Sequence, residues 1–243
     1  IGACDLTAQV MIEAHETGAF QMNAREPIVV AGIDVAARVF RRYDPTLAVE
    51  VLVRDGQRVE KGTRLLEVSG NARSILTTER TALNILQRMS GIATETARYV
   101  DAIRGTRARL IDTRKTTPRL RELEKEAVRH GGGSNHRFAL YDGILIKENH
   151  ITAAGGVSAA VQAAINRSHH LMSVGVEVTN LAELDEAIVA GADVALLDNM
   201  NDDQMREAVT FVNGRDIVLE ASGNITLDRV RDVAATGVNI ISI

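Results

Sequence analysis

Short apolar runs alternate with amphipathic stretches through the second half of the chain. The apolar runs are 110–111, 144–146, 174–176, 194–197, 217–219 and 240–241. Stretches with helical spacing separate most of them, at 120–129, 157–168, 181–190, 203–212 and 227–235. Apolar strands alternating with helices predict a parallel sheet that is covered on its faces. Six units in series predict an incomplete (β/α) barrel, since a complete one has about eight; an open doubly wound sheet is the alternative, but no glycine-rich turn follows the first strand.

The first part of the chain has a different pattern. Short β-rich pieces at 27–32, 49–53 and 65–68 are separated by the turn signals Asp55-Gly56, Lys61-Gly62 and Ser69-Gly70. They predict an N-terminal α/β sandwich domain with an antiparallel sheet. A helical stretch follows at 79–104, in one segment or in two that meet at Ser90-Gly91. We therefore expect an α/β protein with the sandwich domain at 1–80 and the barrel at 81–243.

Composition narrows the classes of function. The net charge is −4, aromatic residues make up 3% and there is no Trp, which opposes nucleic-acid binding. No apolar run is long enough to span a bilayer. The single cysteine, Cys4, excludes an internal disulfide and fits a reducing compartment. We expect a cytoplasmic protein with no nucleic-acid or membrane partner.

Charged or polar residues follow nearly every predicted strand at the same end. In β/α barrels the carboxyl ends of the strands and the loops that follow carry the active site. One such residue alone is more often a solvated loop charge, but repetition in strand after strand weakens that interpretation. The segments concerned are 112–115, 147–150, Glu177, Asp198-Asn199 and 220–223.

These strand ends divide by charge. The cationic set is Arg114, Lys115, His136, Arg137 and Lys147. Arginine offers a planar fork for carboxylates and phosphates, and lysine a compact point charge, so this set suits a ligand with several anionic groups. The triple glycine at 131–133 allows close backbone approach, although flexible loops look the same.

The anionic set is Glu177 and Asp198, at the ends of neighbouring strands. Two such carboxylates can bind a divalent ion, hold ribose hydroxyls or stabilise developing positive charge; solvated or salt-bridged acids are the alternative. Ser222, Gly223 and Asn224 follow the fifth strand and open a predicted helix, which predicts a phosphate site. An ordinary N-cap, for which Thr226 competes, stays open as the other interpretation.

With these residues in view, the chain resembles the quinolinate phosphoribosyltransferase family, also called nicotinate-nucleotide pyrophosphorylase (carboxylating). The resemblance covers nearly the whole length. Its densest segments are 79–84 with 90–94, 112–118, 131–137, 146–150, 197–199 and 222–224. It implies a decarboxylating phosphoribosyltransferase of NAD biosynthesis that uses quinolinate, phosphoribosyl pyrophosphate and Mg²⁺. It also implies a homodimer, or a higher oligomer, with active sites between subunits.

The resemblance further implies a role for each residue. Catalysis would rest on Lys115, Lys147, Glu177 and Asp198. Glu177 and Asp198 would bind ribose and Mg²⁺, Lys115 and Lys147 would also lie near the pyrophosphate and phosphate, and Ser222, Gly223 and Asn224 would cradle the 5′-phosphate. The substrate-binding set, with quinolinate held mainly by Arg114, His136, Arg137 and Lys147, is completed by Thr113 and by Arg80 from the partner subunit.

Several positions depart from the family pattern. Arg119 follows Pro118 where glycine is usual, Gly175 and Thr179 stand where acidic residues are common, and Cys4 precedes Asp5 where glycine is usual. Family members continue beyond the position of Ile243 with a second phosphate contact and a returning tail. We therefore expect further sequence to complete the phosphate site.

Two other functions compete with the leading one. A nicotinate phosphoribosyltransferase needs to bind one carboxylate, whereas the cations around His136 and Arg137 favour two. A regulatory barrel that has kept only the fold predicts loss of Glu177 or Asp198, and both are present.

Overall fold

Antiparallel strands and helices build the first of two compact units, which takes in 1–97 and 117–132. The structure, a computed structural model, describes residue 2 and residues 4–243. Strand β5 (Arg64–Asn71) lies between β1 (Thr17–Asn23) and β3 (Ala48–Val51), and β2 (Ile28–Val29) pairs with β4 (Arg58–Val59). The helices are α1 (Leu6–Met11), α2 (Ile33–Tyr43), most of α3 (Ala72–Ala102) and α4 (Arg121–His130).

Helix α2 packs on this sheet because its apolar residues recur at helical spacing. Ile33 and Phe40, seven residues apart, are buried and share one hydrophobic cluster with Leu66 and Val68 of β5. The predicted N-terminal α/β domain with an antiparallel sheet is confirmed.

Helix α3 runs without a break through Ser90-Gly91. The Ser90 hydroxyl accepts from the backbone N–H of Ala31 at 3.0 Å and donates to its carbonyl at 3.2 Å. Because the Ser90 hydroxyl is buried and has hydrogen-bond partners for both its donor and its acceptor, serine is favourable here inside a helix. The two-segment alternative is therefore wrong.

The division of the chain differs from the expected boundary at residue 80. That position lies inside α3, and the first unit continues to Ala97. Helix α4 also belongs to the first unit, since Ala127 is buried in one cluster with Ala93 and Ala97. Gly131, which ends α4, allows this packing because a Cβ there would lie 2.5 Å from the Ala93 carbonyl oxygen.

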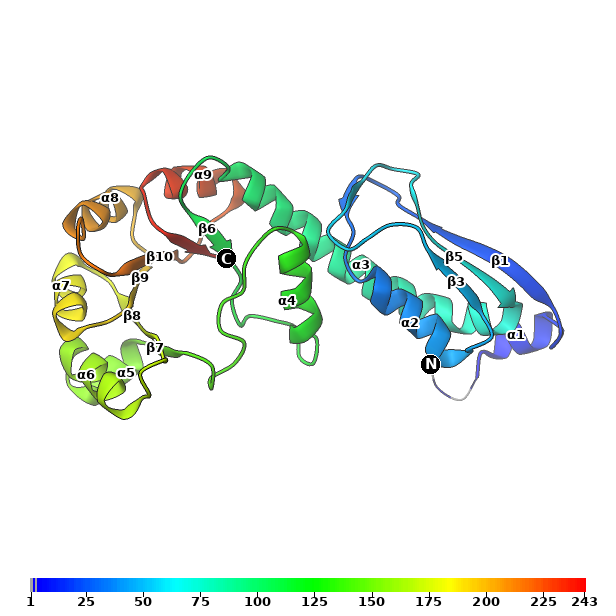
Figure 1. Cartoon of the computed structure of the whole chain (residues 1–243), viewed down its shortest axis with the longest axis horizontal. Coiled ribbons are helices and arrows are strands. Elements are labelled where there is room, and N and C mark those ends of the chain that lie inside the picture. The colour runs from blue at the N-terminus through cyan, green and yellow to red at the C-terminus, as the bar shows by residue number, and fades with distance from the viewer. Residues whose placement is uncertain (1, 3) are drawn as a thin grey trace. The chain divides into compact units, whose positions relative to one another are not determined.

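Six parallel strands form the second unit, which takes in 98–116 and 133–243. Their order is β6-β11-β10-β9-β8-β7, and in Figure 1 they line the inner side of an arc whose outer side carries the helices. The strands are β6 (Arg109–Ile111), β7 (Ile144–Ile146), β8 (Val174–Val178), β9 (Val194–Asp198), β10 (Val218–Ser222) and β11 (Ile240–Ser242). The helices are α5 (Glu148–Ala154), α6 (Val157–Arg167), α7 (Leu181–Ala190), α8 (Asp202–Phe211) and α9 (Leu227–Ala235).

The sheet is an incomplete barrel. Within residue 2 and residues 4–243, no ladder joins the edge strands β6 and β7. Fully buried residues such as Val176, Leu197 and Leu219 form the core between the strands and the helices outside them. The predicted incomplete (β/α) barrel is confirmed, and the alternation of apolar runs and helices that predicted it is seen in the structure.

Candidate active site

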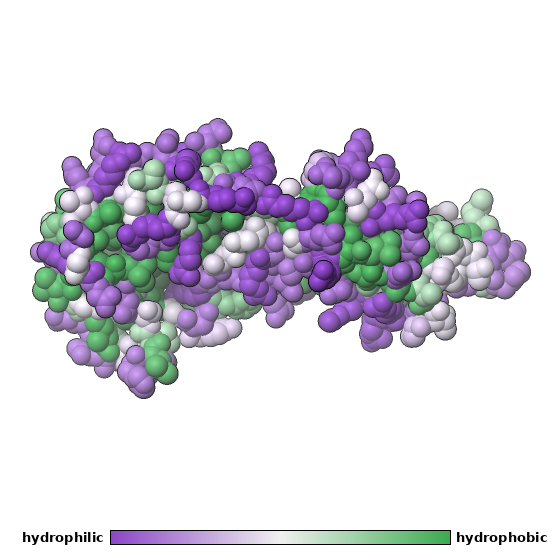
Figure 2. Space-filling model, turned by 45° about the horizontal axis from the view of Figure 1, so that its top comes forward, coloured by the Kyte–Doolittle hydropathy of each residue, from purple (hydrophilic) through white to green (hydrophobic). Residues whose placement is uncertain are grey.

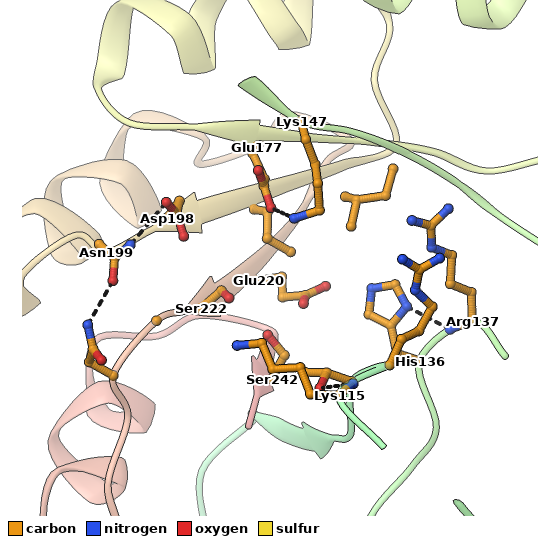
Figure 3. A pocket seen from close by; sticks show the side chains of 16 residues that line it. Lys115, His136, Arg137, Lys147, Glu177, Asp198, Asn199, Glu220, Ser222 and Ser242 are labelled. Carbon is orange, nitrogen blue, oxygen red and sulfur yellow. Dashed lines mark hydrogen bonds and ion pairs between the residues drawn. The ribbon is translucent and has the colours of Figure 1, made fainter. Parts of the chain in front are cut away.

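The carboxyl ends of the parallel strands surround a pocket of about 480 Å³. Figure 3 shows Lys147 and Glu177 on one side of it, His136 and Arg137 on another, and Glu220 between them. Every predicted site residue of the barrel lines it. The full lining is Thr113, Arg114, Lys115, His136, Arg137, Leu145, Lys147, Glu177, Leu196, Asp198, Asn199, Glu220, Ser222, Gly223, Asn224 and Ser242.

The cationic side of the pocket brings two arginines close enough for one to affect the ionisation of the other. Burial lowers the pKa of Arg137, and the positive charge of Arg114 lowers it further, against an opposite effect of Asp142. Arg137 is held in place by its Nη1, which donates to the Gly143 carbonyl at 2.7 Å. An anion placed between the two arginines would therefore bind favourably.

Asp112 holds the loop that carries His136 and Arg137. Its buried carboxylate accepts the His136 backbone N–H and the Asn135 side-chain amide, both at 2.7 Å. The Arg137 backbone N–H donates to His136 Nδ1 at 2.6 Å. In its neutral form the imidazole must then carry its hydrogen on Nε2.

The two carboxylates of the pocket already have partners within the protein. Glu177 forms an ion pair with Lys147, and Asp198 accepts the Asn199 side-chain amide at 3.0 Å. The expected alternative of a salt-bridged acid thus describes Glu177 in this structure. The same pairing keeps a lysine and a carboxylate together in the pocket, where a substrate with both anionic and hydroxyl groups can engage each of them.

Glu220 also lines the pocket, although its sequence position alone predicted no role for it. It is buried, with 4% of its surface exposed. Burial raises its pKa to about 7, with Glu177 acting in the same direction and a hydrogen bond from Ser242 acting against it. The signal was its position two residues before Ser222 on the same strand, since alternate strand residues face the same side. Ser242 and Asn199 also line the pocket without having been assigned.

The turn at 222–224 does not open helix α9. The helix begins at Leu227, and Thr226 is its N-cap, without a side-chain capping bond. The expectation that the turn itself forms the helix N-terminus is therefore wrong, and its competitor Thr226 holds that position. Gly223 has φ 99° and Asn224 φ 51°, and the backbone bends at these two residues before the helix starts.

The positions that depart from the family pattern differ in their local surroundings. Arg119 has φ 66°, a conformation that favours glycine. Thr179 donates from its N–H and its hydroxyl to Glu183 at the start of α7. Gly175 is buried on β8, where a Cβ would lie 3.4 Å from Leu145. Cys4 is exposed and free.

Arg80 is the one predicted site residue outside the pocket. It is exposed on α3 in the first unit. Figure 2 shows polar residues interspersed with apolar ones over the visible face of the molecule. Among the helices of the described residues, none is long and apolar enough to cross a membrane.

Fold and site together define an α/β-barrel protein with a pocket at its strand ends that is lined by basic and acidic side chains. Comparison with known proteins identifies the family within this class. The family model "Quinolinate phosphoribosyl transferase, N-terminal domain" matches residues 5–90, and "Quinolinate phosphoribosyl transferase, C-terminal domain" matches residues 92–243. The chain belongs to the quinolinate phosphoribosyltransferase family.

Individual relatives are similar over the whole chain. The probable nicotinate-nucleotide pyrophosphorylase (carboxylating) of Synechocystis sp. is 43% identical over 100% of this chain and 82% of its own length. The Mycobacterium leprae nicotinate-nucleotide pyrophosphorylase (carboxylating) is 42% identical over 98% of this chain and 85% of its own. The structure of the nicotinate-nucleotide pyrophosphorylase from Francisella tularensis superimposes with a TM-score of 0.95 at 42% identity, over 100% of this chain and 85% of that one.

Proposed function

We propose that this chain is a decarboxylating phosphoribosyltransferase, a pentosyltransferase of NAD biosynthesis. It converts quinolinate and phosphoribosyl pyrophosphate to nicotinate mononucleotide, CO₂ and pyrophosphate. One observation carries the proposal: a single pocket has a cationic side and, opposite it, carboxylates beside the 222–224 turn. Two anionic substrates that must react with each other fit such a divided site.

The cationic side suits quinolinate, a pyridine with two adjacent carboxylates. Arg114 and Arg137 offer forks that bind carboxylates through paired hydrogen bonds. His136 adds an N–H donor, and Thr113 a hydroxyl. A dianion also relieves the repulsion between Arg114 and Arg137 that accompanies the lowered pKa of Arg137.

The carboxylate side suits the ribose of phosphoribosyl pyrophosphate. Glu177 and Asp198 accept hydrogen bonds from its hydroxyls, while Ser222, Gly223 and Asn224 hold the 5′-phosphate. As the bond from C1 to pyrophosphate breaks, C1 becomes electron-deficient, and the two carboxylates stabilise that charge. Lys115 and Lys147 neutralise the departing pyrophosphate. Substrate anions compete with Glu177 for Lys147, so binding frees Glu177 for the ribose.

The same carboxylates fit Mg²⁺. This ion usually takes one or two protein carboxylates and completes its shell with water and substrate phosphates. Among the described residues, no group of three or more His, Cys, Asp or Glu side chains could hold a metal ion. Glu177 and Asp198 would hold the ion, directly or through water, and it would supply charge neutralisation for the pyrophosphate.

Decarboxylation follows from the charge on the ring. The pyridine nitrogen donates its electron pair to C1 of ribose, and the bond to pyrophosphate breaks with its electrons. The ring nitrogen is then cationic, so the carbon beside it can keep the electron pair when its bond to the carboxylate breaks. CO₂ leaves, and a proton from solvent takes its place.

A second chain would complete the site. Arg80 is exposed on α3, outside the pocket, and we assign it to the quinolinate site of a partner subunit in a homodimer. An isologous dimer contributes the same residue in both directions, so each active site would contain one borrowed arginine. We place the enzyme in the cytoplasm, consistent with a free, exposed Cys4.

Product analysis tests the function. With quinolinate, phosphoribosyl pyrophosphate and Mg²⁺, we expect CO₂ and pyrophosphate to appear in equal amounts, and no CO₂ when either substrate is omitted. Nicotinate in place of quinolinate should release little pyrophosphate. Pyrophosphate release with nicotinate and none with quinolinate would establish the nicotinate phosphoribosyltransferase instead, and no release with either would favour a regulatory barrel.

A further inference from the structure

Asn199 joins the ribose side of the pocket to the phosphate turn. It follows β9 directly after Asp198. Its Nδ2 donates to Asp198 Oδ2 at 3.0 Å, and its Oδ1 accepts from Asn224 Nδ2 at 3.2 Å. Figure 3 shows both bonds as one continuous chain. Its backbone N–H also donates to the Ser222 carbonyl at 3.0 Å.

The backbone at this point is suited to asparagine. Asn199 has φ 53° in the left-handed region, which asparagine tolerates better than most residues. Its amide presents a donor and an acceptor at the same end of a short side chain. Aspartate would keep the acceptor and lose the donor, and glycine would keep the backbone and lose both.

Gly223 is fitted to the Asn199 side chain. A Cβ at position 223 would lie 2.2 Å from Asn199 Oδ1 and 2.7 Å from its Cγ. The amide therefore occupies the space that any other residue at 223 would need. The turn and the asparagine form one packed unit.

We propose that Asn199 is a positioning residue that fixes Asp198 and Asn224 relative to one another, and so sets the geometry in which the pocket holds a ribose 5-phosphate. The inference rests on the proposed function, which gives Asp198 the ribose and Asn224 the phosphate. Asn199 acts through these two neighbours. Loss of the Asn199 side chain should therefore weaken the binding of phosphoribosyl pyrophosphate. The binding of quinolinate, which the cationic side holds, should stay nearly unaffected.

Two variants remove the hydrogen bond to Asp198 in different ways. Asn199→Gly keeps the left-handed backbone without strain and removes both hydrogen bonds. Asn199→Asp keeps the acceptor for Asn224, and replaces the donor to Asp198 with a second negative charge. The matched control is Asn201→Ala, because Asn201 caps helix α8 by accepting from the Gln204 N–H at 3.0 Å and does not line the pocket.

The measurement is the dissociation constant of each substrate by calorimetry, with kcat/KM for each alongside. We expect Asn199→Gly and Asn199→Asp to weaken the binding of phosphoribosyl pyrophosphate about tenfold or more, which is the effect of losing one hydrogen bond to a charged group. The binding of quinolinate should weaken less than about twofold. Asn201→Ala should lower Tm and change neither constant.

Unchanged affinity for phosphoribosyl pyrophosphate in the folded Asn199→Gly protein would overturn the inference, as would equal weakening of both substrates. If the wild-type chain turns over its substrates, either result rejects only the proposed role of Asn199. Absence of CO₂ release by the wild-type chain rejects the proposed function itself. The two failures are therefore distinguishable.

Discussion

At the scale of the residue, Glu220 has its ionisation set by its surroundings. Burial raises the pKa of its carboxyl group from 4.5 to about 7. An acid whose pKa is raised in the folded state stabilises the fold at a pH below its unfolded-state pKa. That contribution is lost as pH rises through the folded-state pKa. As pH rises from 4.5 to about 7, the contribution of this group to the free energy of unfolding should fall by roughly 3 kcal/mol.

We predict that Glu220→Gln gains stability relative to wild type as pH rises. Near pH 5 the two proteins should unfold at similar urea concentrations, because both then carry a neutral group at this position. Near pH 8 the variant should be more stable by up to a few kcal/mol. The control is Glu207→Gln on the surface of α8. A difference between Glu220→Gln and wild type that stays constant with pH would contradict the buried, protonated carboxyl.

The sequence predicted which residues line the pocket better than it predicted how they interact. Thr113, Lys147 and Asp198 could be placed because residues at the carboxyl ends of parallel strands share one edge. The hydrogen bonds of Asp112 and Asn199 could not, since they depend on loop conformations that periodicity does not encode. Asn199 and Arg119 adopt left-handed backbone in the structure, and the clearest signal of it in the sequence was at position 119, where the family usually has glycine.

At the scale of the element, helix α4 is fastened to α3 by a charged pair. Arg88 of α3 donates to Glu124 of α4 from Nε at 3.1 Å and from Nη2 at 2.7 Å, and the Thr117 N–H donates to the same carboxylate at 3.1 Å. Burial acts to raise the pKa of Glu124, but the hydrogen bonds from Arg88 and Thr117 outweigh it, so the pKa is lowered.

We predict that Arg88→Ala destabilises the protein by about 1–3 kcal/mol, because it leaves a buried carboxylate with one partner fewer. A carboxylate with a lowered pKa gives stability that is present above its unfolded pKa of about 4.5 and is lost as pH falls through its folded value. The difference between variant and wild type should therefore shrink in acid. The control is Arg104→Ala, whose partner Asp101 is exposed enough that the pair should contribute little. Equal effects of the two substitutions would contradict the account.

Most elements with strong apolar periodicity were predicted, although the amphipathic helix α2 was not, and elements without such periodicity were missed. Each of the six barrel strands overlaps an apolar run, because parallel strands covered by helices are buried on both faces. Helix α5 was missed, since none of its seven residues is buried and no apolar face marks it. Strand β1 was missed for a similar reason: no residue of it is fully buried. The grouping of α4 with the first unit rests on contacts with α3 that lie far away in sequence.

At the scale of the whole molecule, the proposal requires two chains for each active site. We predict that Arg80→Ala and Arg137→Ala are each inactive alone and regain activity when mixed under conditions that exchange subunits. A mixed dimer has one site with both arginines, so equal mixing should restore up to about a quarter of wild-type activity. Two Arg80→Ala preparations mixed together are the control. No recovery at any mixing ratio would exclude a shared site.

The most direct measurement of the central claim is the calorimetric affinity for quinolinate. The claim is that the cationic side of the barrel pocket binds both carboxylates of that ring. We predict that Arg137→Ala weakens binding roughly 30-fold or more, the loss of a paired, charged hydrogen bond. Arg167→Ala, which removes an exposed arginine at the end of α6, should leave affinity unchanged. Near-normal affinity in Arg137→Ala would contradict the assignment of this pocket to the dicarboxylate.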